Sequence, residues 1–162
     1  MKNEKLLKPT LCIIGAGSGG LSVAAGAVQM GASVVLIENH KMGGDCLNYG
    51  CVPSKALLAA GHAAKAMRTA ARLGIEPCNP SVDYNKVREH IQRVQAQIAP
   101  NDSVERFTQL GVDVIKGSPE FIDAKTLTVN DKLIKAKYFV IATGSTAAIP
   151  PIPGLNDVPY LT

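Results

Sequence analysis

The segment GAGSGG (15–20) constrains this sequence most, because it fits the pattern G-x-G-x-x-G where a strand is expected to meet a helix. The apolar run LCIIG (11–15) predicts a buried strand. Apolar residues at helical spacing over 18–30 predict a helix that stops at Gly31. The β-branched run 33–38 predicts a second strand, so these elements form a β-α-β unit whose parallel strands are buried on both faces.

The glycines of this segment have the roles that a dinucleotide site requires. Gly15 permits the tight turn, Gly17 lets the backbone approach a pyrophosphate, and Gly20 lets helix and strand pack closely. The helix N-terminus adds amides and a partial positive charge. Glu38 ends the second strand eighteen residues after Gly20, where a carboxylate accepts hydrogen bonds from a ribose; the alternative for Glu38 is a solvated strand end. The residues favour a dinucleotide, leave FAD and NAD open, and argue mildly against NADP.

The remaining chain predicts helices followed by short strands. We expect Pro53 at a first helical position, a helix over 56–73, and an amphipathic helix over 83–98. The spacing of DSVE (102–105) is that of a capping box with Asp102 in the capping position, and it predicts a short helix that ends at Gly111.

Residues 112–117 predict a strand, and 121–144 predicts strands separated by tight turns, with a hairpin turn at Asn130-Asp131. The predicted fold class is therefore α/β: a Rossmann-like domain with a parallel sheet, helices on one or both faces, and a small antiparallel meander.

Composition limits the classes of function. The 162 residues suit about one domain, and four cysteines are too few for a secreted disulfide scaffold. A net charge of +4 from scattered basic residues, with 4% aromatic residues, argues against nucleic-acid binding. The uncharged stretch 9–37 is rich in glycine and changes its period, which argues against a membrane span or a leader. We therefore expect a cytoplasmic protein.

Cys46 and Cys51 lie five residues apart. In a continuous helix their Cα atoms would be roughly 8 Å apart, beyond disulfide reach, but an irregular turn at 48–50 would bring them together. Cys51 would then begin a helix whose dipole stabilises a thiolate, as dithiol exchange requires. Two inert thiols or a zinc half-site are the alternatives. Zinc would need two more ligands, and no paired spacing supplies them among Cys12, Cys78, His40, His62 and His90.

The sequence GGDCLNYGCVPSK (43–55), placed after this fingerprint, resembles the flavin-dependent pyridine nucleotide–disulfide oxidoreductases. This family includes dihydrolipoamide dehydrogenase, mercuric reductase and glutathione reductase. The resemblance extends from CIIGAGSGG through YFVIATGS (138–145) to PPIPGL. The cysteine segment is most similar to dihydrolipoamide dehydrogenase and to mercuric-reductase-like proteins.

The resemblance implies FAD as the cofactor and NAD(P)H as the co-substrate. Cys51 would face the flavin, Cys46 would exchange with substrate, their disulfide would be catalytic, and Lys55 would lie near the reactive edge of the flavin. Asp45 departs from the threonine that many members carry, and its carboxylate would repel a pyrophosphate unless it turns away or is paired. The implied cofactor-binding residues are Gly15, Gly17, Ser18, Gly19, Gly20, Glu38, Gly43, Gly44, Asp45, Lys55, Gly117, Ala142, Thr143, Gly144 and Ser145; no metal ligand is implied.

Family members are longer than this chain. We expect 1–162 to be the N-terminal part of the FAD-binding domain, ending in a proline-rich junction at about 145–162, without the NAD(P)H and dimerisation domains. The full-length protein would be a homodimer acting on a small molecule or a metal ion, away from membranes, and the chain alone would not turn over. The alternatives are a flavin- or nucleotide-binding module without a catalytic disulfide, and a non-enzymatic domain that keeps the fold.

Overall fold

The computed structural model describes residues 5–160. It begins its central layer with the predicted β-α-β unit, formed by β2 (Leu11–Ile14), α1 (Ser18–Gln29) and β3 (Val34–Glu38). The bounds agree with the sequence pattern to within one residue, because buried β-branched residues and glycine stops mark the ends of these elements. The predicted Rossmann-like β-α-β unit is confirmed.

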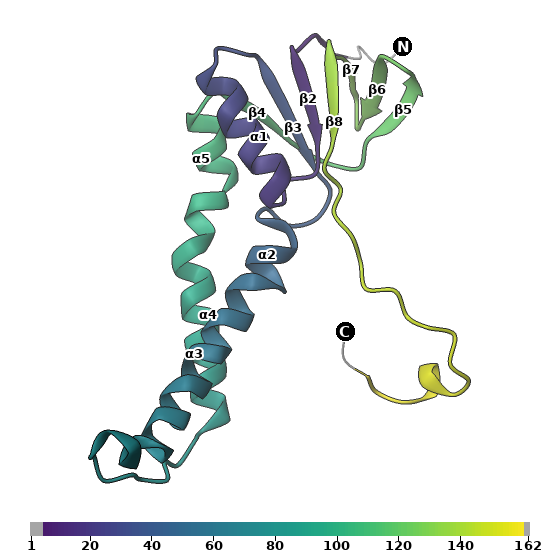
Figure 1. Cartoon of the computed structure of the whole chain (residues 1–162). Coiled ribbons are helices and arrows are strands. Elements are labelled where there is room, and N and C mark those ends of the chain that lie inside the picture. Colours follow the sequence, from purple (N-terminus) through teal and green to yellow (C-terminus); the bar gives the residue numbers. More distant parts are fainter. Residues whose placement is uncertain (1–4, 161–162) are drawn as a thin grey trace.

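Four parallel strands form the main sheet, in the order β4-β3-β2-β8. The outer strands are β4 (Val112–Lys116) and β8 (Tyr138–Ile141). All five residues of β3 are buried, as expected for a strand with neighbours on both sides and layers on both faces. The carboxyl ends of the four strands meet at one edge, directed toward the long helices in Figure 1.

A second sheet covers one face of the first, in the order β1-β7-β6-β5. Its strands are β1 (Lys5–Leu7), β5 (Glu120–Asp123), β6 (Thr126–Val129) and β7 (Lys132–Lys135). The predicted turn at Asn130-Asp131 joins β6 to β7, and Asn130 has φ of 55°. No sequence pattern predicted β1, which pairs in parallel with β7.

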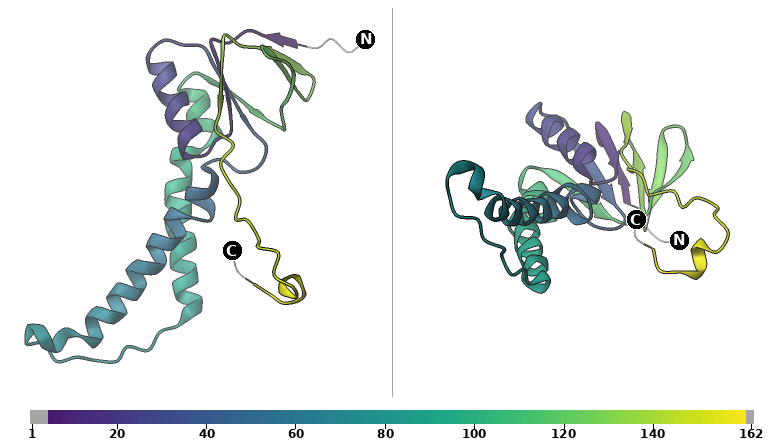
Figure 2. Two further views of the ribbon diagram at one scale, coloured as in Figure 1. Left: turned by 45° about the vertical axis from the view of Figure 1, so that its right-hand side comes forward. Right: turned by 60° about the horizontal axis from the view of Figure 1, so that its bottom comes forward.

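The molecule therefore has three layers above its helical extension (Figures 1 and 2). Helices α1 and α5 (Val104–Gln109) pack on one face of the parallel sheet, with Leu21, Ala24 and Phe107 buried against Ile13 and Leu36. On the other face, Cys12, Ile14, Val35, Ile37 and Ile115 pack on the meander residues Leu127, Val129, Ile134 and Ala136. The sequence allowed helices on one or both faces of the parallel sheet. They lie on one face only, because the meander covers the other.

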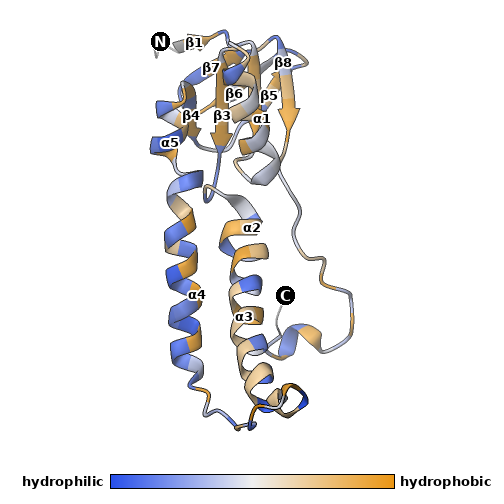
Figure 3. Cartoon of the chain, turned by 60° about the vertical axis from the view of Figure 1, so that its left-hand side comes forward, coloured by the Kyte–Doolittle hydropathy of each residue, from blue (hydrophilic) through white to orange (hydrophobic). Residues whose placement is uncertain are grey.

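A long helical hairpin extends away from the sheets (Figure 2). It contains α2 (Gly44–Asn48), α3 (Cys51–Arg68), η1 (Ala70–Leu73), α4 (Tyr84–Ile98) and η2 (Ala99–Asp102). Helices α3 and α4 lie side by side. In Figure 3 the strands are mostly hydrophobic, whereas α4 carries many hydrophilic residues.

Three local predictions in this hairpin and at its junction with α5 were wrong. Pro53 is the third residue of α3 rather than the first, because the helix already starts at Cys51. The single helix expected over 56–73 ends at Arg68 and is followed by η1. Ser103 caps α5, accepting from the Arg106 N–H at 3.1 Å, since Asp102 is still part of η2.

After β8 the described chain contains only the short η3 (Leu155–Asp157), so the expected proline-rich segment has no strand or long helix up to residue 160. Its last two residues lie outside the described part. Between residues 5 and 160, no helix combines the length and apolar character needed to cross a lipid bilayer.

We predict that Leu36→Ala lowers the free energy of unfolding by about 2–5 kcal/mol, because it removes most of a fully buried side chain from the central strand. Leu58→Ala, at a position that is 50% exposed on α3, is the matched control and should cost much less. Urea unfolding followed by circular dichroism measures both. Equal losses in the two variants would contradict the assignment of β3 to the core.

Candidate functional site

The fingerprint glycines allow backbone segments to approach one another closely. Gly15 has φ of 104°, and a Cβ there would collide with the carbonyl oxygen of Ala142, directly after β8. A Cβ at Gly20 would collide with the carbonyl oxygen of Gly15. The loop after β2 is therefore packed between the first turn of α1 and the turn after β8, as the predicted roles of Gly15 and Gly20 require.

A further close approach joins the fingerprint loop to the cysteine segment. Gly44 has φ of 55°, and a Cβ there would lie 2.6 Å from the Cα of Gly17. The Gly43 N–H donates to the carbonyl oxygen of Ala16 at 2.9 Å. Only glycine fits at position 44, since other residues rarely adopt this backbone conformation and their side chains would strike the loop. The start of α2, which carries Cys46, thus rests directly on the fingerprint.

Glu38 holds the fingerprint loop from the neighbouring strand. Its Oε2 accepts from the Ala16 N–H at 2.7 Å and its Oε1 accepts from the His40 N–H at 2.6 Å. The side chain is only 8% exposed. Each carboxylate oxygen keeps a second lone pair. The solvated strand end considered as the alternative is therefore wrong, and ribose binding by Glu38 stays a prediction.

An open cleft lies at the carboxyl ends of β2, β3, β4 and β8. Nine of the predicted cofactor-binding residues line it: Gly15, Gly17, Glu38, Gly44, Asp45, Ala142, Thr143, Gly144 and Ser145. Ten further residues line it that no sequence pattern singled out for cofactor binding: Ile14, Ile37, Asn39, His40, Lys41, Tyr49, Ser118, Pro119, Thr146 and Ala147. Seven of these ten lie within three residues of the carboxyl end of a parallel strand, where ligands bind in open α/β sheets, so that rule would have found them.

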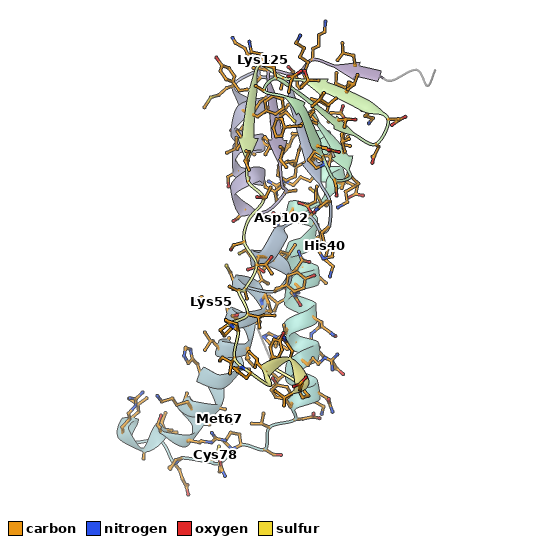
Figure 4. All side chains as sticks on the ribbon, turned by 90° about the vertical axis from the view of Figure 1, so that its right-hand side faces the viewer. His40, Lys55, Met67, Cys78, Asp102 and Lys125 are labelled. Carbon is orange, nitrogen blue, oxygen red and sulfur yellow. The ribbon has the colours of Figure 1, made fainter. Side chains whose placement is uncertain are left out.

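The other predicted residues lie outside the lining of this cleft. Ser18 and Gly19 are exposed at the start of α1, while Gly20 and Gly43 are buried. Gly117 donates from its N–H to the carbonyl oxygen of Glu38 at 2.9 Å. Lys55 is exposed on α3, and Figure 4 shows it along the helical hairpin, apart from His40.

The two cysteines meet across the predicted turn. Cys46 lies in α2, Cys51 is the first residue of α3, and the Tyr49 and Gly50 N–H groups both donate to the carbonyl oxygen of Asp45, at 2.8 and 2.7 Å. Both cysteines are free thiols. Interaction with the Cys51 side chain is the largest cause that raises the pKa of Cys46; burial and nearby negative charge add to it, and the Cys51 backbone N–H opposes it. The turn therefore brings the thiols together, as disulfide exchange requires.

Asp45 and Tyr49 connect the cysteine turn to the cleft. Asp45 is exposed, and its Oδ2 lies 3.3 Å from where a Cβ on Gly50 would be, so the carboxylate is directed toward the turn. The Tyr49 hydroxyl is hydrogen-bonded to His40 Nε2 at 3.1 Å, and Lys41 Nζ lies 5.1 Å from the centre of the Tyr49 ring. One wall of the cleft is thus part of the cysteine turn itself.

The comparisons with known proteins agree with this geometry. A family model described as pyridine nucleotide-disulphide oxidoreductase matches residues 9–161. The chain is 38% identical over 152 residues to a mercuric reductase of Staphylococcus aureus, covering 94% of this chain and 28% of the relative. It is 34% identical over 148 residues to a dihydrolipoyl dehydrogenase of Acholeplasma laidlawii, covering 91% of this chain and 44% of the relative.

A solved structure has the same arrangement. The flavoprotein disulfide reductase RclA from Escherichia coli, in a Cu(II) complex, superposes with a TM-score of 0.74 at 27% identity, covering 92% of this chain and 31% of that one. The chain therefore spans less than half the length of these three proteins. The family model is thus named for a pyridine nucleotide and a disulphide, and the solved neighbour is named a flavoprotein.

We predict that Glu38→Gln lowers the free energy of unfolding by about 1–3 kcal/mol, because the amide NH₂ faces one of the two N–H groups and leaves it unpaired. Glu105→Gln, exposed on α5, is the matched control and should leave stability nearly unchanged. Thermal unfolding of both variants measures the difference. A fully stable Glu38→Gln chain would show that this carboxylate does not hold the loop.

We predict that Cys51→Ala shifts the alkylation of Cys46 by iodoacetamide to lower pH. The Cys51 hydrogen bond is the largest cause that raises the Cys46 pKa, so its loss increases the thiolate fraction of Cys46 at a given pH. Burial raises the pKa of Cys12 to about 12, so Cys12 should stay unlabelled in the folded chain. Peptide mass spectrometry follows each cysteine separately. An unchanged pH profile for Cys46 would mean that the two thiols do not interact.

Proposed function

The chain belongs to the pyridine nucleotide-disulphide oxidoreductase family, and from this premise we propose that residues 1–162 are the N-terminal part of its FAD-binding domain. The whole protein would transfer electrons between NAD(P)H and a Cys46–Cys51 disulfide. The observation that carries this proposal is the packing of the cysteine segment on the fingerprint loop, through Gly17 and Gly44. A dinucleotide held by that loop would extend toward the cysteine turn.

The residues of the cleft fit a dinucleotide. The backbone at Gly15 and Gly17 borders the cleft without side chains, and the first N–H groups of α1 have no partners within the helix. We assign the pyrophosphate to Gly15, Gly17, Ser18, Gly19 and Gly20, and the adenosine end to Glu38 and Gly117. The remaining contacts would come from Gly43, Gly44, Asp45, Ala142, Thr143, Gly144 and Ser145, with Lys55 near the reactive edge. When bound, FAD supplies the two-electron chemistry that links NAD(P)H to the cysteine pair.

The two cysteines would divide the exchange chemistry between them. The Cys46 thiolate attacks one sulfur of a substrate disulfide, and the other sulfur leaves as a thiol after protonation. The Cys51 thiolate then attacks the Cys46 sulfur, which releases the second substrate thiol and closes the Cys46–Cys51 disulfide. With a dithiol substrate, the same steps run in reverse.

The wider properties of the whole protein are part of the same proposal. A small disulfide or dithiol, or a metal ion, is the proposed substrate class, since the relatives are named mercuric reductase and dihydrolipoyl dehydrogenase. We propose a cytoplasmic homodimer, and the cytoplasm is favoured because exchange thiols must stay reducible. We also propose that the protein does not bind nucleic acid or membranes, because its basic residues are scattered. A binding module without a catalytic disulfide is not favoured, because the matching family model is that of the disulphide oxidoreductases and the solved neighbour is a disulfide reductase.

The proposal is tested by FAD binding to Gly44→Ala. The new Cβ would strike Gly17 and demand a backbone conformation that alanine rarely adopts, so we expect at least a tenfold loss of affinity, or about 1.4 kcal/mol. Gly61→Ala is the matched control, because a Cβ at this helical position meets nothing within 4 Å. Flavin fluorescence titration gives both affinities, and circular dichroism verifies folding. FAD binding that is equal in the two variants, or absent from the unaltered chain, would contradict the proposal.

A further inference from the structure

A glutamine from the long hairpin reaches the cysteine turn. Gln95 lies on α4, and its Nε2 donates to the carbonyl oxygens of Leu47 at 3.1 Å and Asn48 at 3.0 Å, across separations of 48 and 47 residues. The side chain is half-buried. These acceptors belong to the last two residues of α2, so the amide binds the end of the helix that carries Cys46.

The end of α2 needs such a partner. The last carbonyl groups of a helix accept no hydrogen bond from N–H groups of the same helix. Helix α2 has only five residues before the chain turns at Tyr49 and Gly50. At the other end, Asn48 Nδ2 donates to the carbonyl oxygens of Met42 and Gly44, at 3.0 and 2.7 Å. The Asn48 side chain thus fixes the start of α2, and Gln95 fixes its end.

We propose that Gln95 is a positioning residue for the Cys46–Cys51 pair, holding the end of α2 so that the Cys46 thiol stays against the first residue of α3. The proposal rests on the proposed function, because it concerns the same pair of cysteines. A turn held by two hydrogen bonds has fewer conformations than a free one, so the effective concentration of one thiol at the other is higher. The disulfide then forms more readily from the reduced pair.

The segment that carries Gln95 contacts the cysteine segment a second time. Asp102, at the end of η2, has its Oδ2 3.1 Å from where a Cβ on Gly43 would lie, and its negative charge contributes to the raised pKa of Cys46. Figure 4 shows Asp102 where the hairpin meets the sheets. The hairpin is therefore hydrogen-bonded to the end of α2 and lies close to its start, so a displacement of α4 would be transmitted to the thiols.

The test is the equilibrium of the 162-residue chain with glutathione. The reaction is Cys46–SH plus Cys51–SH plus glutathione disulfide giving the Cys46–Cys51 disulfide plus two glutathione molecules. We use a Cys78→Ser background, because Cys78 is exposed and would compete, whereas Cys12 is buried. Gln95→Met keeps the length and packing of the side chain but removes the donor, and we expect the equilibrium constant to fall about tenfold. Gln92→Met, exposed on the same helix, should leave it unchanged.

Thermal unfolding separates positioning from simple stabilisation. The Gln95→Met substitution is also made in a chain with both Cys46 and Cys51 replaced by serine. The thermal stability lost there is the effect of Gln95 on the fold in the absence of the cysteine pair. An unchanged glutathione equilibrium in Gln95→Met, whatever the loss of thermal stability, would overturn the inference alone. If the unaltered chain forms no Cys46–Cys51 disulfide at any glutathione ratio, the proposed function fails, and this inference fails with it.

Discussion

The contact between two glycine backbones, at Gly17 and Gly44, is the constraint on which the site depends. It brings the loop after β2 against the start of α2, and the Gly43 N–H bonded to Ala16 keeps the two segments in register. A side chain at position 44 would separate them, because Gly17 offers only main-chain atoms that cannot move aside. The fingerprint loop and the cysteine turn thereby become parts of one structure, although more than twenty residues separate them in the sequence.

The parallel sheet supplies the frame for this contact. Glu38, at the end of the central strand, holds the loop through Ala16, while the turn after β8 closes on Gly15 from the other side. Since the carboxyl ends of parallel strands share one edge, the cleft forms there without a further device. The helical hairpin also contacts this site, because Gln95 of α4 and Asp102 of η2 reach α2 from elements that follow α3 in the chain.

Sequence patterns predicted the elements that local chemistry determines. Glycine turns, β-branched runs and helical periodicity located the β-α-β unit and the hairpin at Asn130. They did not predict β1, since a three-residue strand is defined only by its partner β7. They also did not predict the cap at Ser103, since the adjacent Asp102 and Ser103 could each cap the helix. The contacts of Gln95 and Tyr49 depend on tertiary packing, which no local pattern encodes. The roles assigned to the cofactor-binding residues came from the family resemblance and stay predictions.

The proposed function requires that one thiol of the pair lies against a flavin held by the fingerprint loop. The most direct measurement is the visible absorption spectrum of the chain with bound FAD, recorded during stepwise reduction. We expect a long-wavelength charge-transfer band that is lost in Cys51→Ser and kept in Cys78→Ser. Bound flavin without such a band, or a band that survives in Cys51→Ser, would contradict the proposed function.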